Sequence, residues 1–195
     1  GGSRCFDRKR IEGLQAALEG SPARVEEVRR IPKRVLAPLL YDLTELQREA
    51  SRRFNYSAKE TLNIMQRLYE NHKVLTYPRT DSRYLSQDIV PTLKERLRAC
   101  GVGPYRQMAS RLASRPLPAK LFFVDNNKVS DHHAIIPTEQ FVQLEHMTVD
   151  ERRIYDLVVR RFLAVLFPPY EYEQTRVTAL IGQERFTAHG NVVKS

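Results

Sequence analysis

Three short sequence signatures predict where helices begin in the middle of this chain, and the flanking segments are predicted to contain β structure. Thr44–Gln47, Ser57–Glu60 and Thr148–Glu151 each place a hydroxyl residue three positions before Glu or Gln, which is the spacing of a helical capping box. Apolar residues recur at helical spacing after each of them. By contrast, residues 175–188 alternate apolar and polar side chains about a turn at Gly182-Gln183, which is typical of a β-hairpin. The pattern predicts an α+β fold with a mostly helical middle.

The N-terminal segment predicts a further helix and strand. Asp7 is placed to cap a helix whose apolar residues lie on one face and which ends near Gly20. Residues 25–35 then combine valine and isoleucine with many basic residues and a proline, which indicates a strand followed by a linker. Residues 1–3, Gly-Gly-Ser, have the composition of a cloning scar. A strand pattern still continues at residue 195, so we expect the chain to be a piece of a larger protein.

The charge balance indicates a polyanionic partner. The 195 residues include 32 Lys and Arg against 23 Asp and Glu, a net charge of +9. These basic residues are spread among aromatic ones rather than along one amphipathic helix, which favours nucleic acid over a membrane surface. The sequence has no apolar run of about 18 residues, so we expect no membrane span. Cys5 and Cys100 have no metal-ligand spacing, and we expect reduced thiols in a cytoplasmic protein.

The stretch Val74–Leu85 gathers the groups that phosphate chemistry uses. Its first residues favour the end of a strand, and Pro78 favours an extended Tyr77, so the phenol is presented where the strand stops. A phenol titrates near pH ~10 and is a weak nucleophile at neutrality unless a cation stabilises its oxyanion. Arg79 supplies a permanent, forked cation two residues later. Tyr77 is therefore a candidate nucleophile, and the alternative is a surface tyrosine beside surface arginines.

A second polar group lies at Asp131-His132-His133. Adjacent side chains point in different directions on any regular element, so we expect at most one of the two histidines to face a given site. A histidine beside an acid suits a general acid or base. Metal binding has weak support, because no carboxylate cluster or second spaced His or Cys group accompanies the pair. We therefore predict no metal ligands in this chain.

Together these motifs carry a resemblance to a known family. Thr76-Tyr77-Pro78-Arg79-Thr80-Asp81-Ser82-Arg83-Tyr84-Leu85, followed later by Asp131-His132-His133-Ala134-Ile135-Ile136-Pro137-Thr138, resembles the type IA DNA topoisomerases, most closely the bacterial topoisomerase III branch. The upstream segments Tyr41–Gln47 and Ala58–Tyr69 are similar to the family's approach to its tyrosine. The resemblance extends over nearly the whole chain from Phe6 onward.

The resemblance assigns roles to individual residues. It implies that Tyr77 attacks a phosphodiester of single-stranded DNA, forming a 5′-phosphotyrosine and a free 3′-hydroxyl, so that religation requires no ATP. It implies that Arg79 stabilises the phosphate and that His132 hydrogen-bonds the DNA backbone and takes part in proton transfer. The residues expected to shape the loop or contact DNA are Thr80, Asp81, Ser82, Arg83 and His133.

The family fold also implies a domain organisation. Residues 41–130 would form a movable, helix-turn-helix-like gate domain that bears the tyrosine. Residues 4–40 and 131–195 would form parts of a β-rich arch domain into which the gate is inserted. The family's Mg²⁺ is bound by an acidic cluster in another domain, and no Asp-x-Asp-x-Asp occurs here. The resemblance therefore implies Mg²⁺ in the parent enzyme but none in this chain, the remaining domains as partners, a nucleoid-associated location, and no relaxation of DNA by this chain alone.

Other classes of function remain as alternatives. The first is a module that binds single-stranded DNA through phosphate contacts and aromatic stacking and catalyses no reaction. The second is a metal-dependent phosphoesterase built on Asp131-His132-His133, but this class needs further aspartates that the sequence lacks. A replication-initiator nuclease is less favoured, because that class has a His-x-His motif, whereas His132 and His133 of this chain are adjacent.

Overall fold

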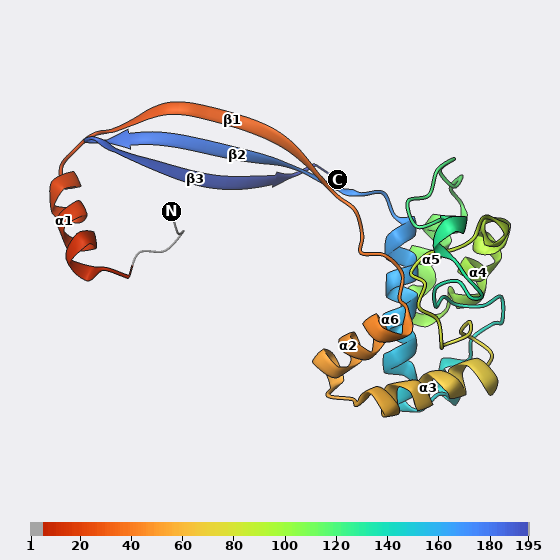
Figure 1. Cartoon of the computed structure of the whole chain (residues 1–195). Coiled ribbons are helices and arrows are strands. Elements are labelled where there is room, and N and C mark those ends of the chain that lie inside the picture. Colours follow the sequence, from red (N-terminus) through yellow and green to blue (C-terminus); the bar gives the residue numbers. More distant parts are fainter. Residues whose placement is uncertain (1–5, 195) are drawn as a thin grey trace. The chain divides into compact units, whose positions relative to one another are not determined.

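The computed structural model describes residues 6–194 and divides them between two compact units (Figure 1). The first, here called the sheet unit, combines the N-terminal residues up to Val35 with the residues from Pro169 onward. The second, here called the helical unit, runs from Leu36 to Pro168. The expected cloning scar at residues 1–3 and the thiol of Cys5 lie outside the described residues.

The sheet unit consists of one helix and a three-stranded antiparallel sheet. Helix α1 (Arg8–Leu18) is capped by Asp7, as predicted, and strands β1 (Ala23–Val35), β2 (Tyr170–Ile181) and β3 (Glu184–Val193) follow the order β1-β2-β3. Gly182 has a φ of 61° in the turn between β2 and β3, so the predicted hairpin is confirmed. The expected linker is absent from residues 23–35, since Pro32 pairs within β1. An edge strand tolerates a proline because one side of it needs no ladder hydrogen bond.

The helical unit contains several helices joined by short connections. Its helices are α2 (Leu43–Phe54), α3 (Ala58–Glu70), α4 (Leu93–Cys100), α5 (Arg106–Ala113) and α6 (Val149–Leu166), with 3-10 turns η1 (Gln87–Thr92), η2 (Gly103–Tyr105), η3 (Asn126–Lys128) and η4 (Leu144–His146). Helix α6 packs against α2, α3 and α5, and Tyr155 and Phe162 are buried at its centre. Cys100 is a free, buried thiol in the same core, and burial raises its pKa to about 12.

The helix starts agree with the sequence at two of the three capping boxes. Ser57 and Thr148 each accept a hydrogen bond from the backbone of Glu60 and Glu151, and each glutamate bonds back to the cap. The predicted cap of α2, Thr44, is wrong, because the observed cap is Asp42, two residues earlier. The Asp42 carboxylate accepts a hydrogen bond from the backbone nitrogen of Glu45 at 2.7 Å and so satisfies an amide of the first turn.

The segment around α4 departs from its sequence pattern at two points. Ser86 and the apolar residues that follow it favour one capped helix, but the structure has the turn η1, which contains Pro91, and then the shorter α4, and the Ser86 hydroxyl makes no capping bond. A proline lacks the amide hydrogen that a continuous α-helix would use there. Residues 121–124 are all apolar and favour a short buried strand, but they contribute a single bridge between Val124 and Leu85. The local sequence pattern therefore identifies the apolar segments but not their secondary structure.

The limits of the compact units also differ from the expected domains. We expected residues 131–195 to share a domain with residues 4–40, but residues 131–168 belong to the helical unit. The physical reason is packing, because α6 buries Ile154, Val158 and Phe162 in the core that α3 also lines. An amphipathic helix buries its apolar face against the nearest apolar surface, whatever its position in the chain.

Candidate functional site

Two segments far apart in the chain are held side by side by backbone pairing. We call residues 76–85 the tyrosine loop and residues 129–138 the histidine segment. The Thr76 amide donates to the Ile136 carbonyl at 3.0 Å, and the Ile136 amide donates to the Thr76 hydroxyl at 3.0 Å. The Ala134 amide donates to the Tyr84 carbonyl at 2.9 Å. These bonds pin both ends of the tyrosine loop against the histidine segment.

The pairing brings Tyr77 and His132 together. Their ring centroids lie 4.1 Å apart with the planes inclined by 34°. On α3, Tyr69 meets the Tyr77 ring edge-on, with centroids 5.6 Å apart. Tyr77 is half-buried, whereas His132 is exposed and its ring nitrogens make no hydrogen bond within residues 6–194. The phenol is therefore held between two rings while its neighbouring imidazole remains available.

Tyr69 was missed as a site residue by sequence reasoning. Met65 and Tyr69 recur at helical spacing in the sequence, a pattern that predicts that both lie on the core face of their helix. Met65 is fully buried, but Tyr69 is 36% exposed and its ring contacts Tyr77. Tyr69 reaches the site from the last turn of α3, whereas its neighbour Leu68 in the same turn is fully buried in the core. Only its position in the final turn before the loop could have signalled this.

Arg79 extends from the tyrosine loop into solvent. Its side chain is exposed, and no hydrogen bond or ion pair engages its guanidinium within the part of the chain that the structure describes. Asp81 is likewise exposed and forms no such contact among those residues. A guanidinium offers a fork of donors that suits phosphate oxygens. The loop therefore presents a cation two residues after the phenol.

Thr80 and Ser82 are buried and build the loop. The Thr80 hydroxyl donates to the His132 carbonyl at 3.0 Å and accepts from the Ser82 amide at 3.1 Å. The Ser82 hydroxyl donates to the Lys128 carbonyl at 2.7 Å. Each residue is only 5% exposed. These hydroxyls therefore shape the loop from inside, and in this conformation both already form hydrogen bonds within the protein.

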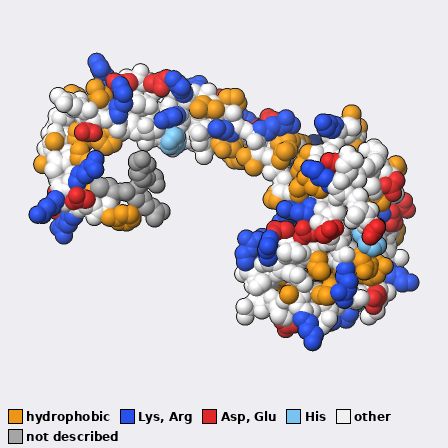
Figure 2. All heavy atoms as spheres, in the orientation of Figure 1, with side chains coloured by type: hydrophobic (Ala, Val, Ile, Leu, Met, Phe, Trp, Pro, Cys, Tyr) orange, Lys and Arg blue, Asp and Glu red, His pale blue; other side chains and the backbone are white. Residues whose placement is uncertain are grey.

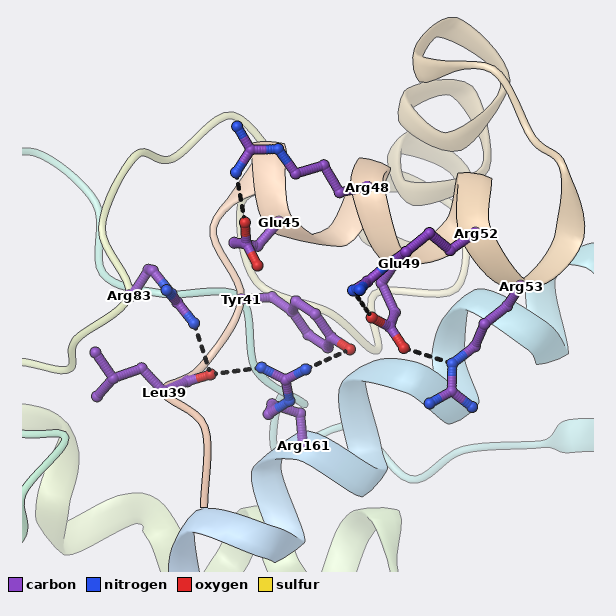
Figure 3. A network of polar contacts seen from close by, with 9 residues as sticks. All are labelled: Leu39, Tyr41, Glu45, Arg48, Glu49, Arg52, Arg53, Arg83 and Arg161. Atoms are coloured by element: carbon purple, nitrogen blue, oxygen red, sulfur yellow. Dashed lines mark hydrogen bonds and ion pairs between the residues drawn. The ribbon is translucent and has the colours of Figure 1, made fainter. Parts of the chain in front are cut away.

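Arg83 also points inward. Its guanidinium donates from Nε to the Leu40 carbonyl at 3.1 Å and from Nη2 to the Leu39 carbonyl at 3.4 Å. Arg161 of α6 donates to the same Leu39 carbonyl and to the Tyr41 hydroxyl, both at 2.9 Å (Figure 3). The two cations hold the segment that enters α2 against the tyrosine loop. Arg83 therefore has a structural task that its sequence position did not reveal.

His133 faces the other way from His132, as expected for adjacent side chains. Its Nδ1 lies 2.8 Å from the Ala134 carbonyl, so this nitrogen carries the proton, and Nε2 is the acceptor in the neutral ring. Burial lowers the pKa of His133, although the hydrogen bond to Ala134 opposes the shift. Burial therefore favours the neutral ring.

Arg96 anchors the far end of the histidine segment, and sequence analysis did not single it out. It lies on α4, is 6% exposed and donates from Nη1 to the Pro137 carbonyl at 2.9 Å. Its Nη2 forms an ion pair with Glu139 at 2.7 Å. A buried guanidinium requires such partners because an unpaired buried charge is costly. Arg96 thus ties α4 to the segment that carries His132.

A cavity of about 300 Å³ opens beside Tyr77. The tyrosine loop, the segment from Ser86 into η1, the turn η3 and the histidine segment line it, with Tyr77, Ser86, Asp88, Asn126, Asp131, His132 and His133 among the lining residues. No lysine or arginine is among the described residues of this lining. The site therefore combines an exposed cation on the loop with a polar cavity of acidic character.

Charged side chains are mixed over the surface of both units. In the view of Figure 2, basic and acidic side chains are interspersed rather than gathered into one basic patch. Within residues 6–194, no group of three or more His, Cys, Asp or Glu is placed to hold a metal ion, so the residues present do not form a Mg²⁺ ligand set. None of the described helices is long and apolar enough to cross a membrane.

Comparisons with known proteins agree on one family. All of residues 1–195 match the family described as DNA topoisomerase. DNA topoisomerase 3 from Bacillus anthracis is 58% identical over 193 residues, which cover 99% of this chain and 26% of that protein. The protein of the same name from Bacillus subtilis strain 168 is 52% identical over 193 residues, with the same coverage.

A solved structure has a similar fold. Full-length topoisomerase I from Thermotoga maritima aligns with a TM-score of 0.67 and 25% identity, covering 99% of this chain and 31% of that one. The chain thus spans about a quarter of the length of the curated relatives that it matches.

Proposed function

This chain belongs to the DNA topoisomerase family, as a type IA, topoisomerase III-like member, and we propose that it carries the tyrosine half of a split active site. The substrate is single-stranded DNA, which is cleaved transiently through a 5′-phosphotyrosine and religated without ATP after strand passage. The observation that carries the proposal is the Tyr77 ring stacked 4.1 Å from His132, with the free guanidinium of Arg79 two residues away.

The proposed cleavage step balances as a phosphoryl transfer. The Tyr77 oxygen bonds to phosphorus, the bond from phosphorus to the 3′-oxygen breaks, and the 3′-oxygen gains a proton as the phenol loses one. Tyr69 and His132 restrict the phenol ring from two sides, which lowers the entropy cost of reaching an attacking geometry. The exposed imidazole of His132 hydrogen-bonds the DNA backbone and moves a proton.

Arg79 acts on the phosphate. Its forked cation stabilises negative charge on the phosphate oxygens and on the tyrosyl oxygen as the bond order changes. A cation that already has a protein partner would first have to lose it, and Arg79 has none within residues 6–194. Asp81, Arg83 and His133 remain predicted DNA contacts, although Arg83 would have to release two backbone carbonyls to make one.

We propose that the family's Mg²⁺ is bound outside this chain. The described residues do not form a ligand set for it. The metal-binding domain of the parent enzyme would supply it, together with acid and base groups. The isolated chain would therefore bind single-stranded DNA without relaxing duplex DNA.

We also propose that the tyrosine-bearing body moves as a gate. The helical unit has its own core, so residues 131–168 would move together with the expected gate residues 41–130. The sheet unit would then be the part of this chain that belongs to the arch domain. Large rigid bodies that move about short connections are a common way to open and close a site.

The test is a covalent trapping experiment. The chain is mixed with labelled single-stranded DNA, Mg²⁺ and a separately produced metal-binding half of a related topoisomerase. We expect a denaturation-resistant adduct linked through the 5′ end, lost in Tyr77→Phe and retained in the control Tyr170→Phe, which changes an exposed tyrosine of β2. An adduct that persists in Tyr77→Phe would contradict the proposal.

A second candidate function is a binding module without chemistry. The net charge of +9 favours it. In that case the chain would bind single-stranded DNA in a salt-sensitive way, no adduct would form with the added half, and Tyr77→Phe would leave binding unchanged.

A further inference from the structure

The cavity beside Tyr77 is lined by Tyr77 and His132, which take part in the proposed cleavage step, and by further residues to which that step gives no role. It has a volume of about 300 Å³, at the lower end of the range of about 300–1,000 Å³ for small-molecule sites. Such a volume suits one planar ring system rather than a whole nucleotide. Tyr77 forms part of its wall, so whatever enters it lies next to the attacking oxygen.

Two carboxylates of the lining disfavour phosphate as the occupant of the space between them. Asp88 and Asp131 contribute these carboxylates, and the described lining holds no lysine or arginine to offset them. Like charges at close range repel each other. The group that lies beside the two aspartates must therefore be neutral or offer hydrogen-bond donors, and the phosphate stays at Tyr77 and His132.

The lining also presents a mixed set of hydrogen-bonding groups. The Asn126 side-chain oxygen accepts from the Gln87 amide at 2.7 Å, which leaves its Nδ2 amino group as a donor. The Ser86 hydroxyl makes no capping bond. His133 keeps its proton on Nδ1 and offers Nε2 as an acceptor. Together with the two aspartates, the cavity offers mostly acceptors and a few donors, which matches the edge of a nucleobase that carries an amino group.

We infer that this cavity is a subsite for the nucleobase directly 3′ of the break, and that it favours bases with an exocyclic amino group. The inference rests on the proposed function, because the phosphate transferred to Tyr77 belongs to that nucleotide. After cleavage its base stays attached to the phenol through that phosphate. Adenine, cytosine and guanine can each donate an exocyclic amino hydrogen to Asp88 or Asp131. The base-edge donor of thymine, N3–H, is instead flanked by two carbonyl oxygens, which the carboxylates repel.

The first test changes the DNA. The full-length parent enzyme is given four oligonucleotides that differ only in the base 3′ of one cleavage site, and the rate of adduct formation is measured. We expect cytosine to react about fivefold or more faster than thymine, in line with base-edge hydrogen bonds. A cytosine analogue that lacks only the amino group should react as slowly as thymine. Equal rates for all four bases, or for cytosine and its analogue, would overturn the subsite.

The second test changes the protein. Asp88→Asn and Asp131→Asn keep the side-chain shape but replace an acceptor oxygen by a donor, so the cytosine preference should fall markedly in at least one of them. Glu95→Gln, which removes an exposed carboxylate of α4 outside the cavity, is the matched control and should keep the preference. An unchanged preference in both aspartate variants would overturn the subsite.

The outcomes also separate the subsite from the proposed function. A Tyr77-dependent adduct that forms equally with all bases would overturn the subsite alone. Absence of a Tyr77-dependent adduct with every oligonucleotide would overturn the proposed function, and the subsite with it.

Discussion

The two units of this chain place the same kinds of residue in opposite environments. In the helical unit, Val158 and Val159 of α6 are 1% and 0% exposed. In the sheet unit, Val25 and Val28 of β1 are 58% and 54% exposed, and no described residue of α1, β1, β2 or β3 is buried. Burial of apolar area is the dominant stabilising term in folding. The helical unit therefore supplies its own core, whereas the sheet unit is held mainly by backbone pairing.

The difference matters for chemistry. A nucleophile must be held within a narrow geometry, which requires neighbours locked by packing. Tyr77, His132 and the bonds that pair their segments all lie in the helical unit. The sheet unit offers long strands in which no described residue is buried, and this suits a connecting or framing role better than a reacting site.

The largest expected effect is on stability when a core side chain is truncated. Phe162→Ala in α6 should lower the free energy of unfolding by about 3–5 kcal/mol, since it removes a fully buried aromatic ring. Val28→Ala in β1 should cost less than ~1 kcal/mol, because that side chain is already half exposed. Urea unfolding of both variants measures this. Equal losses would mean that the sheet unit has a core of its own.

A second prediction concerns two threonines. Thr80→Val removes a buried hydroxyl that bonds the His132 carbonyl and the Ser82 amide, and should cost about 1–3 kcal/mol and reduce adduct formation. Thr187→Val in β3 changes an exposed residue and should lie within about 0.5 kcal/mol of the parent chain. The two variants have the same chemistry, so unfolding and trapping assays on both isolate the role of the loop. A neutral Thr80→Val would show that the loop does not depend on this link.

The smallest expected effect is a pH dependence. Burial would raise the pKa of Glu151, but hydrogen bonds from Arg67 and from the Thr148 amide outweigh burial and hold the pKa below its usual range. A carboxyl with a lowered folded-state pKa stabilises the fold above its unfolded pKa of about 4.3, and the gain is lost as pH falls through the folded value.

Glu151→Gln should therefore destabilise the chain by about 1–2 kcal/mol at pH 7 and show a weaker acid dependence below pH ~5. Glu27→Gln in β1 is the control, since Glu27 makes an ion pair that is largely exposed. Unfolding curves at a series of pH values measure both. A parallel acid response in the parent chain and Glu151→Gln would contradict the assignment.

Much of the local structure could be predicted from the sequence. Capping at Ser57 and Thr148, the hairpin about Gly182 and the helix after Asp7 depend on residues a few positions apart, and each is confirmed. The cap of α2 was missed because Asp42 and Thr44 both offer a suitable oxygen, and only the structure shows which one the first turn uses.

The site could be predicted only in part. Two motifs predicted Tyr77, Arg79 and His132 as site residues, and the structure places the rings of Tyr77 and His132 in contact. Tyr69 and Arg96 reach the site through tertiary contacts, which no local spacing encodes. The placement of residues 131–168 in the helical unit likewise depends on long-range packing of α6.

The central claim of the proposed function is that everything this chain contributes to DNA cleavage lies in the helical unit. The most direct measurement compares the whole chain with residues 36–168 alone, each mixed with the same metal-binding half, Mg²⁺ and labelled single-stranded DNA. We predict a Tyr77-dependent adduct of comparable yield from both. Loss of the adduct from residues 36–168, when that piece remains folded by circular dichroism, would contradict the claim and place part of the reacting site in the sheet unit.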